Sequence, residues 1–156
     1  MPETHQRTLL VVIDDSAECR SALRYACQRA LHSGGRVALL KVIDGSELLH
    51  QWQGIEQAML EEMREKAEEE LQQLAQTVAQ QVGVLPVLHV REGKPAQEII
   101  NLIKQEPEID VLVLGGCSSA DNPLVNYVLS QGLGELHVPI TIVPDVMTID
   151  DIDRIS

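Results

Sequence analysis

A chain of 156 residues is long enough for one domain that buries roughly two-thirds of the surface of its unfolded state. Its 24 Asp and Glu residues outnumber its 12 Lys and Arg, and the net charge of -12 would repel both a nucleic-acid backbone and an anionic membrane. Aromatic residues make up 2% of the chain and Phe is absent, so bases have little to stack on and the core must be aliphatic.

The first half of the chain predicts two buried strands and two helices. The run TLLVVI at residues 8–13 is apolar and rich in β-branched residues, as in a strand that is covered on both faces. Asp-Asp-Ser then offers a helix cap, and apolar residues follow at helical spacing as far as Gly34-Gly35. RVALLKVI at 36–43 predicts a second strand, and residues 55–82 predict the longest helix.

The second half of the chain continues this alternation. Residues 84–90 (VLPVLHV) predict a third strand, and Gly-Lys-Pro at 93–95 opens a helix with proline near its first position, where the missing N–H costs least. Residues 109–114 predict a fourth strand and residues 138–143 a fifth, with a mainly helical segment at 124–136 between them.

The alternation of apolar strands and amphipathic helices predicts an α/β fold, with a doubly wound, Rossmann-like parallel sheet and helices on both faces. In such a sheet, ligands bind at the carboxyl ends of the strands, beside the point where the strand order reverses. This rule selects residues 14–16, 42–44 and 115–122 as candidate binding segments.

Cysteine and histidine residues show no pattern of a metal or disulfide site. Cys19, Cys27 and Cys117 are odd in number and form no CxxC pair, which is typical of reduced thiols in a cytoplasmic protein, and the five histidines are scattered. No apolar run approaches the ~18 residues of a membrane helix, and the polar N-terminal segment does not resemble a signal peptide. We therefore expect a cytoplasmic protein without a metal.

Three segments carry motifs in a shared order. VVIDDSAECRSALRYA (11–26) joins a strand to a helix through Asp-Asp-Ser, and residues 90–116 hold a Gly-x-Pro-Ala helix that leads into an Asp-headed strand and a glycine. HVPITIVP (137–144) is a strand entered through proline. Together, over about residues 8–144, these segments resemble the universal stress protein family in order and spacing. The resemblance implies a five-stranded parallel sheet of order 3-2-1-4-5, usually in a homodimer.

One branch of that family binds ATP through Gly-x2-Gly-x9-Gly-Ser/Thr after the fourth strand, and this chain resembles the branch that lacks the intact motif. Gly115 matches the first glycine, but Ser118 stands at the second. Counting forward places residues 128–129 at the final Gly-Ser, and counting back from Pro139 places residues 126–127 there. Neither pair is Gly-Ser, so the triphosphate cradle is expected to be degenerate.

The resemblance also implies positions for a nucleotide base. Asp14 matches the residue that accepts from the adenine amino group, and Val42 matches the valine whose backbone contacts the base. Their structural alternatives are a helix cap and a core residue, and the two glycines after the fourth strand would simply turn the chain out of the sheet. We expect no tightly held cofactor and at most weak binding of AMP or ATP. The candidate residues are Asp14, Asp15, Ser16, Val42, Gly115, Gly116, Ser118 and Ser119.

Two functions remain open: a non-enzymatic regulatory or binding module of the stress response, and an adenine-nucleotide sensor of the same fold. A phosphoacceptor receiver domain would need an Asp after the third strand and a Lys after the fifth, and the sequences there, HVREG and IVPD, hold neither. No Ser-His-Asp elbow, HExxH or Walker A motif indicates an enzyme.

The last strand predicts how the chain assembles. In the order 3-2-1-4-5 it lies at the sheet edge, and because it is apolar and uncharged it should pair with a second copy. We expect a homodimer and a further protein partner, and neither nucleic acid nor membrane. The pairing residues would be Val138, Pro139, Ile140, Thr141, Ile142 and Val143.

We expect one domain over residues 1–156, with a core at 8–144 and an acidic tail at 145–156. The tail carries isoleucines at spacing three, and Thr148 and Asp151 stand at capping-box positions. This pattern predicts a short helical turn that docks Ile149, Ile152 and Ile155 on the domain or across the dimer, and the alternative is a frayed terminus.

Overall fold

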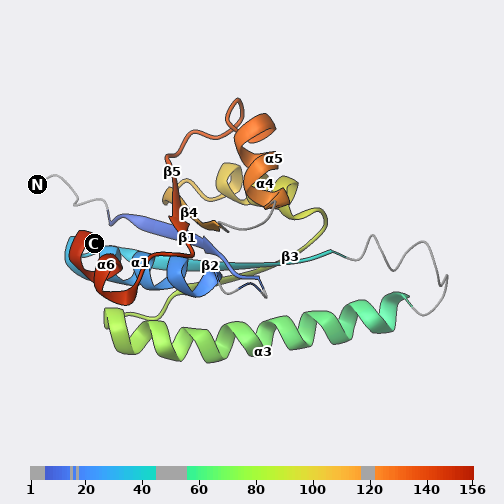
Figure 1. Ribbon diagram of the computed structural model, residues 1–156. Coiled ribbons are helices and arrows are strands. Elements are labelled where there is room, and N and C mark those ends of the chain that lie inside the picture. The colour runs from blue at the N-terminus through green and yellow to red at the C-terminus, as the bar shows by residue number, and fades with distance from the viewer. Residues whose placement is uncertain (1–5, 15, 17, 45–55, 117–121) are drawn as a thin grey trace, which may run out of the picture.

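The computed structural model describes residues 6–14, 16, 18–44, 56–116 and 122–156 (Figure 1). Five strands within these residues form one parallel sheet in the order β3-β2-β1-β4-β5, which confirms the predicted fold and strand order. The strands are β1 (Thr8–Val12), β2 (Arg36–Ile43), β3 (Val87–Glu92), β4 (Ile109–Gly116) and β5 (Ile140–Pro144).

Helices cover both faces of the sheet. In Figure 1, α1 and α3 lie on one face, α4 and α5 lie on the other, and α6 lies beside α1. None of the helices in the described part of the chain is long and apolar enough to cross a membrane. The helices are α1 (Glu18–Ser33), α3 (Glu56–Val82), α4 (Pro95–Gln105), α5 (Pro123–Tyr127), which continues into the π-helical turn η1 (Val128–Gly132), and α6 (Ile149–Ile155).

The central position of β1 explains why four of its five residues are apolar. All five of its residues are buried, and their side chains alternate between two cores. Leu9 and Val11 pack in the core beneath α1 and α3, whereas Leu10 and Val12 pack in the core beneath α4 and α5. A strand with helices on both faces has no solvent side, so a polar residue in either alternation would be buried.

Several strand boundaries differ from those expected. The third strand begins at Val87 and not at Val84, because Val84 and Leu85 form an exposed connection with 44% and 62% of their surface accessible. The fourth strand extends to Gly116, and the fifth begins at Ile140. A proline directly precedes the observed start of the third strand and of the fifth. Since proline lacks an N–H, it cannot donate to a sheet ladder.

The C-terminal tail forms the predicted helix, α6, and docks on α1 of the same chain. The capping box is complete: the Thr148 hydroxyl accepts from the N–H of Asp151, and the Asp151 carboxylate accepts from the N–H of Thr148, both at 3.1 Å. Ile152 is 1% exposed and belongs to the core beneath α1.

The expectation that all three isoleucines dock is wrong. Ile149 and Ile155 are 62% and 52% exposed. Residues three apart in a helix are about 60° apart around its axis, so a helix this short that rests on one neighbour buries only the middle member of the series. Arg24 of α1 holds the tail from the side, with Nε and Nη2 at 3.0 and 2.8 Å from the two oxygens of Asp153.

Candidate functional site

The carboxyl ends of β1, β2 and β4 lie side by side, because β1 pairs with β2 on one side and with β4 on the other. The strand order reverses here, since the chain runs outward from β1 to β3 and then returns to β4 beside β1. The predicted binding segments therefore meet at one edge of the sheet. Asp15, Ser118 and Ser119, together with Cys117, lie outside the described residues.

Asp14 follows β1 at this edge and is exposed to solvent. Its Oδ1 atom accepts hydrogen bonds from the backbone N–H of Ser16, at 2.8 Å, and from the Ser16 hydroxyl. These bonds close a tight turn that leads from β1 towards α1. One carboxylate oxygen thus serves the local turn, while within the described part of the chain Oδ2 has no hydrogen-bond partner and can accept from a ligand.

Val42 lies near the end of β2, half-buried, with its side chain packed on the core beneath α4. The carbonyl of Leu40 accepts from the N–H of Ile13 at 2.7 Å, so Leu40 faces β1. Backbone direction alternates along a strand, so the N–H and carbonyl of Val42, two residues later, point to the same side of β2 as those of Leu40. At the level of Val42, β1 has already ended, so in the described sheet this backbone has no partner strand on that side. This backbone is placed to contact a flat ligand lying beside Asp14.

Gly115 and Gly116 do not turn the chain out of the sheet, so that interpretation is wrong. They are the last residues of β4, pair with Val143 and Pro144 of β5, and do not have positive φ angles. A Cβ at Gly116 would lie 2.8 Å from Cγ2 of Ile142, closer than side chains approach one another. Gly116 therefore allows β5 to pack closely against β4, a structural role independent of any ligand.

Asn122 is the last residue of the predicted segment 115–122, but it is not among the candidate residues named from the sequence. Its Oδ1 accepts from the N–H of Val125 at 3.1 Å, and its Nδ2 donates to the carbonyl of Gly115 at 3.1 Å. The side chain therefore caps α5 and ties the start of that helix to the end of β4. The local signal was an Asn followed by a Pro, which is a favourable N-cap and first helical residue.

The N-terminus of α5 has few N–H groups to offer a phosphate. Pro123 at its first position has none, and the N–H of Val125 is already taken by Asn122. Both positions predicted for the final Gly-Ser pair, 126–127 and 128–129, lie inside α5 and η1 and not at the start of the helix. The segment between β4 and this helix is thus shorter than either count assumed, because Asn122 already begins the helix.

The two described cysteines are buried in α1, with 7% of Cys19 and 1% of Cys27 exposed. Burial raises the pKa of each thiol to about 11. Both are core residues, and since the thiolate is the reactive form, neither is suited to redox sensing. The described residues also contain no group of three or more His, Cys, Asp or Glu that could hold a metal.

Iodoacetamide should leave Cys19 and Cys27 unmodified in the folded protein at about pH 8, because buried, protonated thiols do not react. Both should be alkylated in concentrated guanidinium chloride, which serves as the positive control. Peptide mapping by mass spectrometry distinguishes the two sites from Cys117. Alkylation of either α1 cysteine in the folded protein at the rate of a free thiol would contradict their burial.

Comparison with known proteins agrees with the fold. The model of the Universal stress protein family matches residues 6–144. UspA from Lactobacillus plantarum is 21% identical with a TM-score of 0.72, over 90% of this chain and 99% of that one. A universal stress protein family member from Burkholderia pseudomallei is 18% identical with a TM-score of 0.70, over 92% and 99%.

A third similar structure contains a ligand. It is a universal stress protein family protein from Arabidopsis thaliana with AMP bound, 16% identical with a TM-score of 0.61, over 88% of this chain and 91% of that one. No functionally curated protein sequence matches the chain significantly. At these identities the structures establish a shared fold.

Proposed function

Because this chain belongs to the universal stress protein family, we propose that it is a homodimeric regulatory or binding module of stress adaptation that catalyses no reaction. The start of α5 supports binding over catalysis. Phosphoryl transfer depends on donors that hold the phosphates in line, and here Pro123 and Asn122 remove two of those donors. We place the module in the cytoplasm, where a reducing environment suits the unpaired Cys19 and Cys27.

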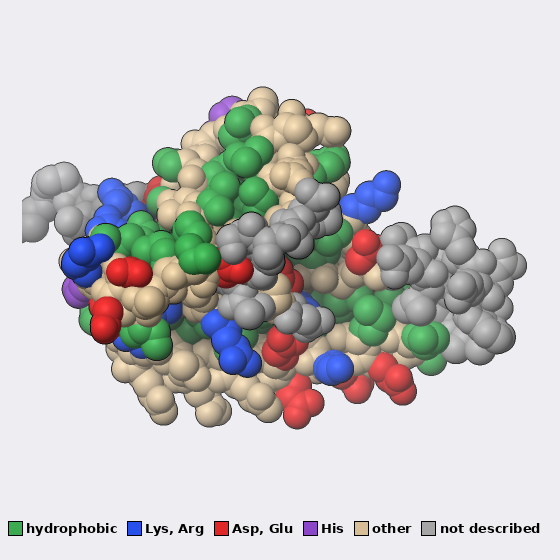
Figure 2. All heavy atoms as spheres, viewed as in Figure 1, with side chains coloured by type: hydrophobic (Ala, Val, Ile, Leu, Met, Phe, Trp, Pro, Cys, Tyr) green, Lys and Arg blue, Asp and Glu red, His purple; other side chains and the backbone are tan. Residues whose placement is uncertain are grey.

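The observation that supports a dimer is the open edge of the sheet at β5. This strand pairs only with β4 in the described sheet, and it bears no charged residue. Ile142 is 36% exposed on it. Hydrophobic side chains gather over the upper part of the molecule, where β5 and α5 lie (Figure 2). An uncharged, partly apolar edge of this kind is a template for strand pairing, and a two-fold axis would satisfy both copies at once.

The hydrogen bonds of β5 show which residues are available for that pairing. Pro139 accepts from Leu112 of β4 at 2.9 Å, and the N–H of Asp145 donates to Gly116 at 2.8 Å. Since direction alternates along the strand, Thr141 also faces β4 and its N–H belongs to the internal ladder. The N–H groups that face the free edge are those of Ile140 and Ile142.

Ile142→Pro should convert the dimer to a monomer at micromolar concentration, because proline removes an outward N–H while leaving the bonds to β4 in place. Leu88→Pro is the matched control. Leu88 is 37% exposed on β3, the opposite edge of the sheet. The N–H of Gly93 donates inward to Ile43, and because Leu88 is an odd number of residues away, its own N–H faces outward. That edge carries His89, Arg91 and Glu92, which disfavour pairing.

Light scattering after size exclusion, with native mass spectrometry, measures the result. The unchanged protein and Leu88→Pro should have twice the 17.2 kDa mass of one chain, and Ile142→Pro should have that mass once. A monomeric unchanged protein would contradict the dimer. A dimer that survives Ile142→Pro would place the interface away from β5.

A second candidate function is an adenine-mononucleotide sensor. Two features favour it: Oδ2 of Asp14, which has no hydrogen-bond partner among the described residues, and the backbone of Val42 in β2, beside the end of β1. Together they offer an acceptor and a flat surface for a base. The Arabidopsis relative with AMP bound supports the same assignment. A mononucleotide does not require the triphosphate grip that the start of α5 lacks.

A further inference from the structure

A pocket lies at the opposite end of the sheet, at the amino ends of the strands and on the face covered by α1. Its volume is ≈ 120 Å³. No candidate residue of the carboxyl-end site lines this pocket. The residues that line the pocket are Arg7, Leu9, Tyr25, Arg29, Ser33, Val111, Pro139 and Thr141.

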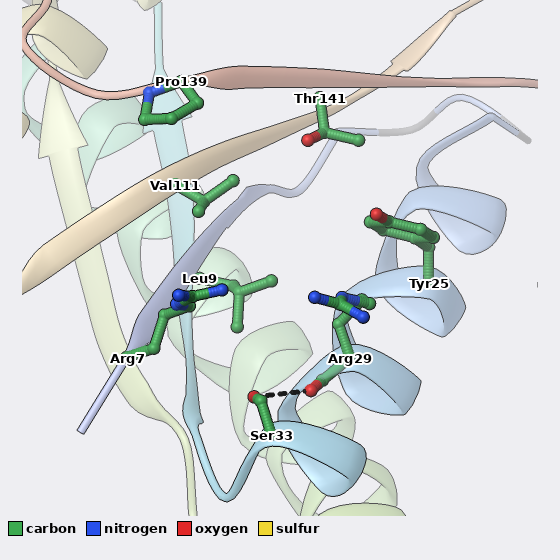
Figure 3. A pocket seen from close by; sticks show the side chains of 8 residues that line it. All are labelled: Arg7, Leu9, Tyr25, Arg29, Ser33, Val111, Pro139 and Thr141. Atoms are coloured by element: carbon green, nitrogen blue, oxygen red, sulfur yellow. Dashed lines mark hydrogen bonds between the residues drawn. The ribbon is translucent and has the colours of Figure 1, made fainter. Parts of the chain in front are cut away.

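Two guanidinium groups face each other across this pocket. Figure 3 shows Arg7, just before β1, and Arg29, on α1, pointing toward one another, with Leu9 between them. None of the lining residues is acidic, and among the described residues neither arginine has an ion-pair partner. Arg24 on the same helix differs, since it is paired with Asp153. In a chain of net charge -12, two facing cations without an ion pair to any described residue are a local exception.

Hydroxyl groups on the pocket wall add possible donors. Tyr25 lies one helical turn from Arg29, and Thr141 lines the opposite side from β5 (Figure 3). The Ser33 hydroxyl is not available as a donor, because it donates to the carbonyl of Arg29 at 2.7 Å. Leu9 is 3% exposed and forms an apolar base, so a bound ion would be partly removed from water.

We propose that this pocket binds the phosphate group of a small molecule, either inorganic phosphate or a phosphomonoester, between Arg7 and Arg29. Guanidinium groups donate two parallel hydrogen bonds to phosphate oxygens, and a dianion matches two cations. A pocket of ≈ 120 Å³ is large enough to hold a phosphate group. The remainder of a phosphomonoester would lie outside the pocket.

The test is a titration of the full-length protein with inorganic phosphate at low ionic strength, followed by NMR of the backbone amides. Saturable shifts should concentrate at the lining residues, above all Leu9, Tyr25 and Thr141. Arg7→Gln and Arg29→Gln should each weaken binding by about tenfold or more, the effect of losing one charge-assisted contact. Arg7 lies before β1 and is exposed, so its replacement leaves the fold intact.

Arg20→Gln is the matched control, because it removes the same charge from an exposed position of the same helix, outside the pocket. It should change the affinity by less than about twofold. The proposal is overturned if the lining amides show no saturable shift below ~20 mM phosphate, or if Arg20→Gln weakens binding as much as Arg29→Gln. Light scattering on each variant checks that an altered oligomeric state is not the cause.

Methyl phosphate as a second probe separates the two sources of the phosphate group. Affinity similar to that of inorganic phosphate supports a phosphomonoester whose remainder projects from the pocket. Affinity at least about tenfold weaker supports inorganic phosphate as the occupant.

Discussion

Mg-ATP is expected to bind this protein with a dissociation constant of about 1 mM or weaker. A tight triphosphate site needs several N–H groups that converge on the phosphates at a helix N-terminus. In α5 the first N–H is absent at Pro123, and the N–H of Val125 is bonded to Asn122 at 3.1 Å. Losing two or three charge-assisted contacts at roughly 1.5–3 kcal/mol each weakens a micromolar site to the millimolar range.

AMP and adenosine should bind at least as well as ATP, because the γ- and β-phosphates find no grip and the net charge of -12 repels them. Calorimetry with Mg-ATP, AMP and adenosine compares the three directly. Asp14→Asn keeps one side-chain oxygen, which can still accept from Ser16 in the turn. The amide nitrogen then replaces Oδ2, so a ligand base meets a donor where it met an acceptor. This substitution should therefore weaken all three ligands by a similar factor.

A dissociation constant for Mg-ATP below ~10 μM, about −7 kcal/mol, would contradict this conclusion and make the nucleotide sensor the leading function. Gly115 would then be the first described residue to replace. Equal affinity of the unchanged protein and Asp14→Asn for adenosine would instead separate Asp14 from the base site.

The fold could be predicted because its signals are local. All five residues of β1 are buried and four of them are apolar, and glycine and capping residues mark the ends of the helices. The third strand shows the limit. Val84 and Leu85 are apolar but exposed, and an apolar pair before Pro86 looks the same whether it is a strand or a connection. Only the packing of α3 against β2 and β3 decides which segment is covered.

The candidate site could be predicted in its location but not in its detail. The carboxyl ends of β1, β2 and β4 follow from the order of elements alone. The start of α5 did not follow, because counting along a motif assumes a loop length, and Asn122 begins the helix earlier. No local sequence pattern indicates that Arg7 and Arg29 line the same pocket, since the two residues come together only when α1 folds onto the sheet.

Ile152→Ala should lower the free energy of unfolding by about 2–4 kcal/mol, because this side chain is 1% exposed and fills the core beneath α1. For a domain of this size that corresponds to a fall in Tm of roughly 4–16 °C. Thermal unfolding at one fixed protein concentration measures it, since dimerisation would make Tm depend on concentration. Ile149→Ala, in the same helix but 62% exposed, should change Tm by no more than about 2 °C.

Acid should weaken the same docking. Hydrogen bonds from Arg24 hold the pKa of Asp153 below its usual value, and bonds from Thr148 do so for Asp151. A lowered pKa in the folded state means that the contribution is present above the usual value of 3.8 and is lost as the pH falls through the lower one. The difference in Tm between the unchanged protein and Ile152→Ala should therefore narrow below about pH 4.

Deletion of residues 148–156 sets the upper limit for the cost of Ile152→Ala. A seven-residue helix held by one buried side chain, one ion pair and a hydrogen bond between His32 Nδ1 and a backbone oxygen of Ser156 can undock as a unit. The alanine variant therefore cannot lose more than the whole docking free energy. The deletion should thus have a Tm equal to or lower than that of Ile152→Ala. A Tm for Ile152→Ala well below that of the deletion would mean that the cavity damages the core beneath α1 itself. An unchanged Tm in both variants would mean that α6 rests on α1 without stabilising it.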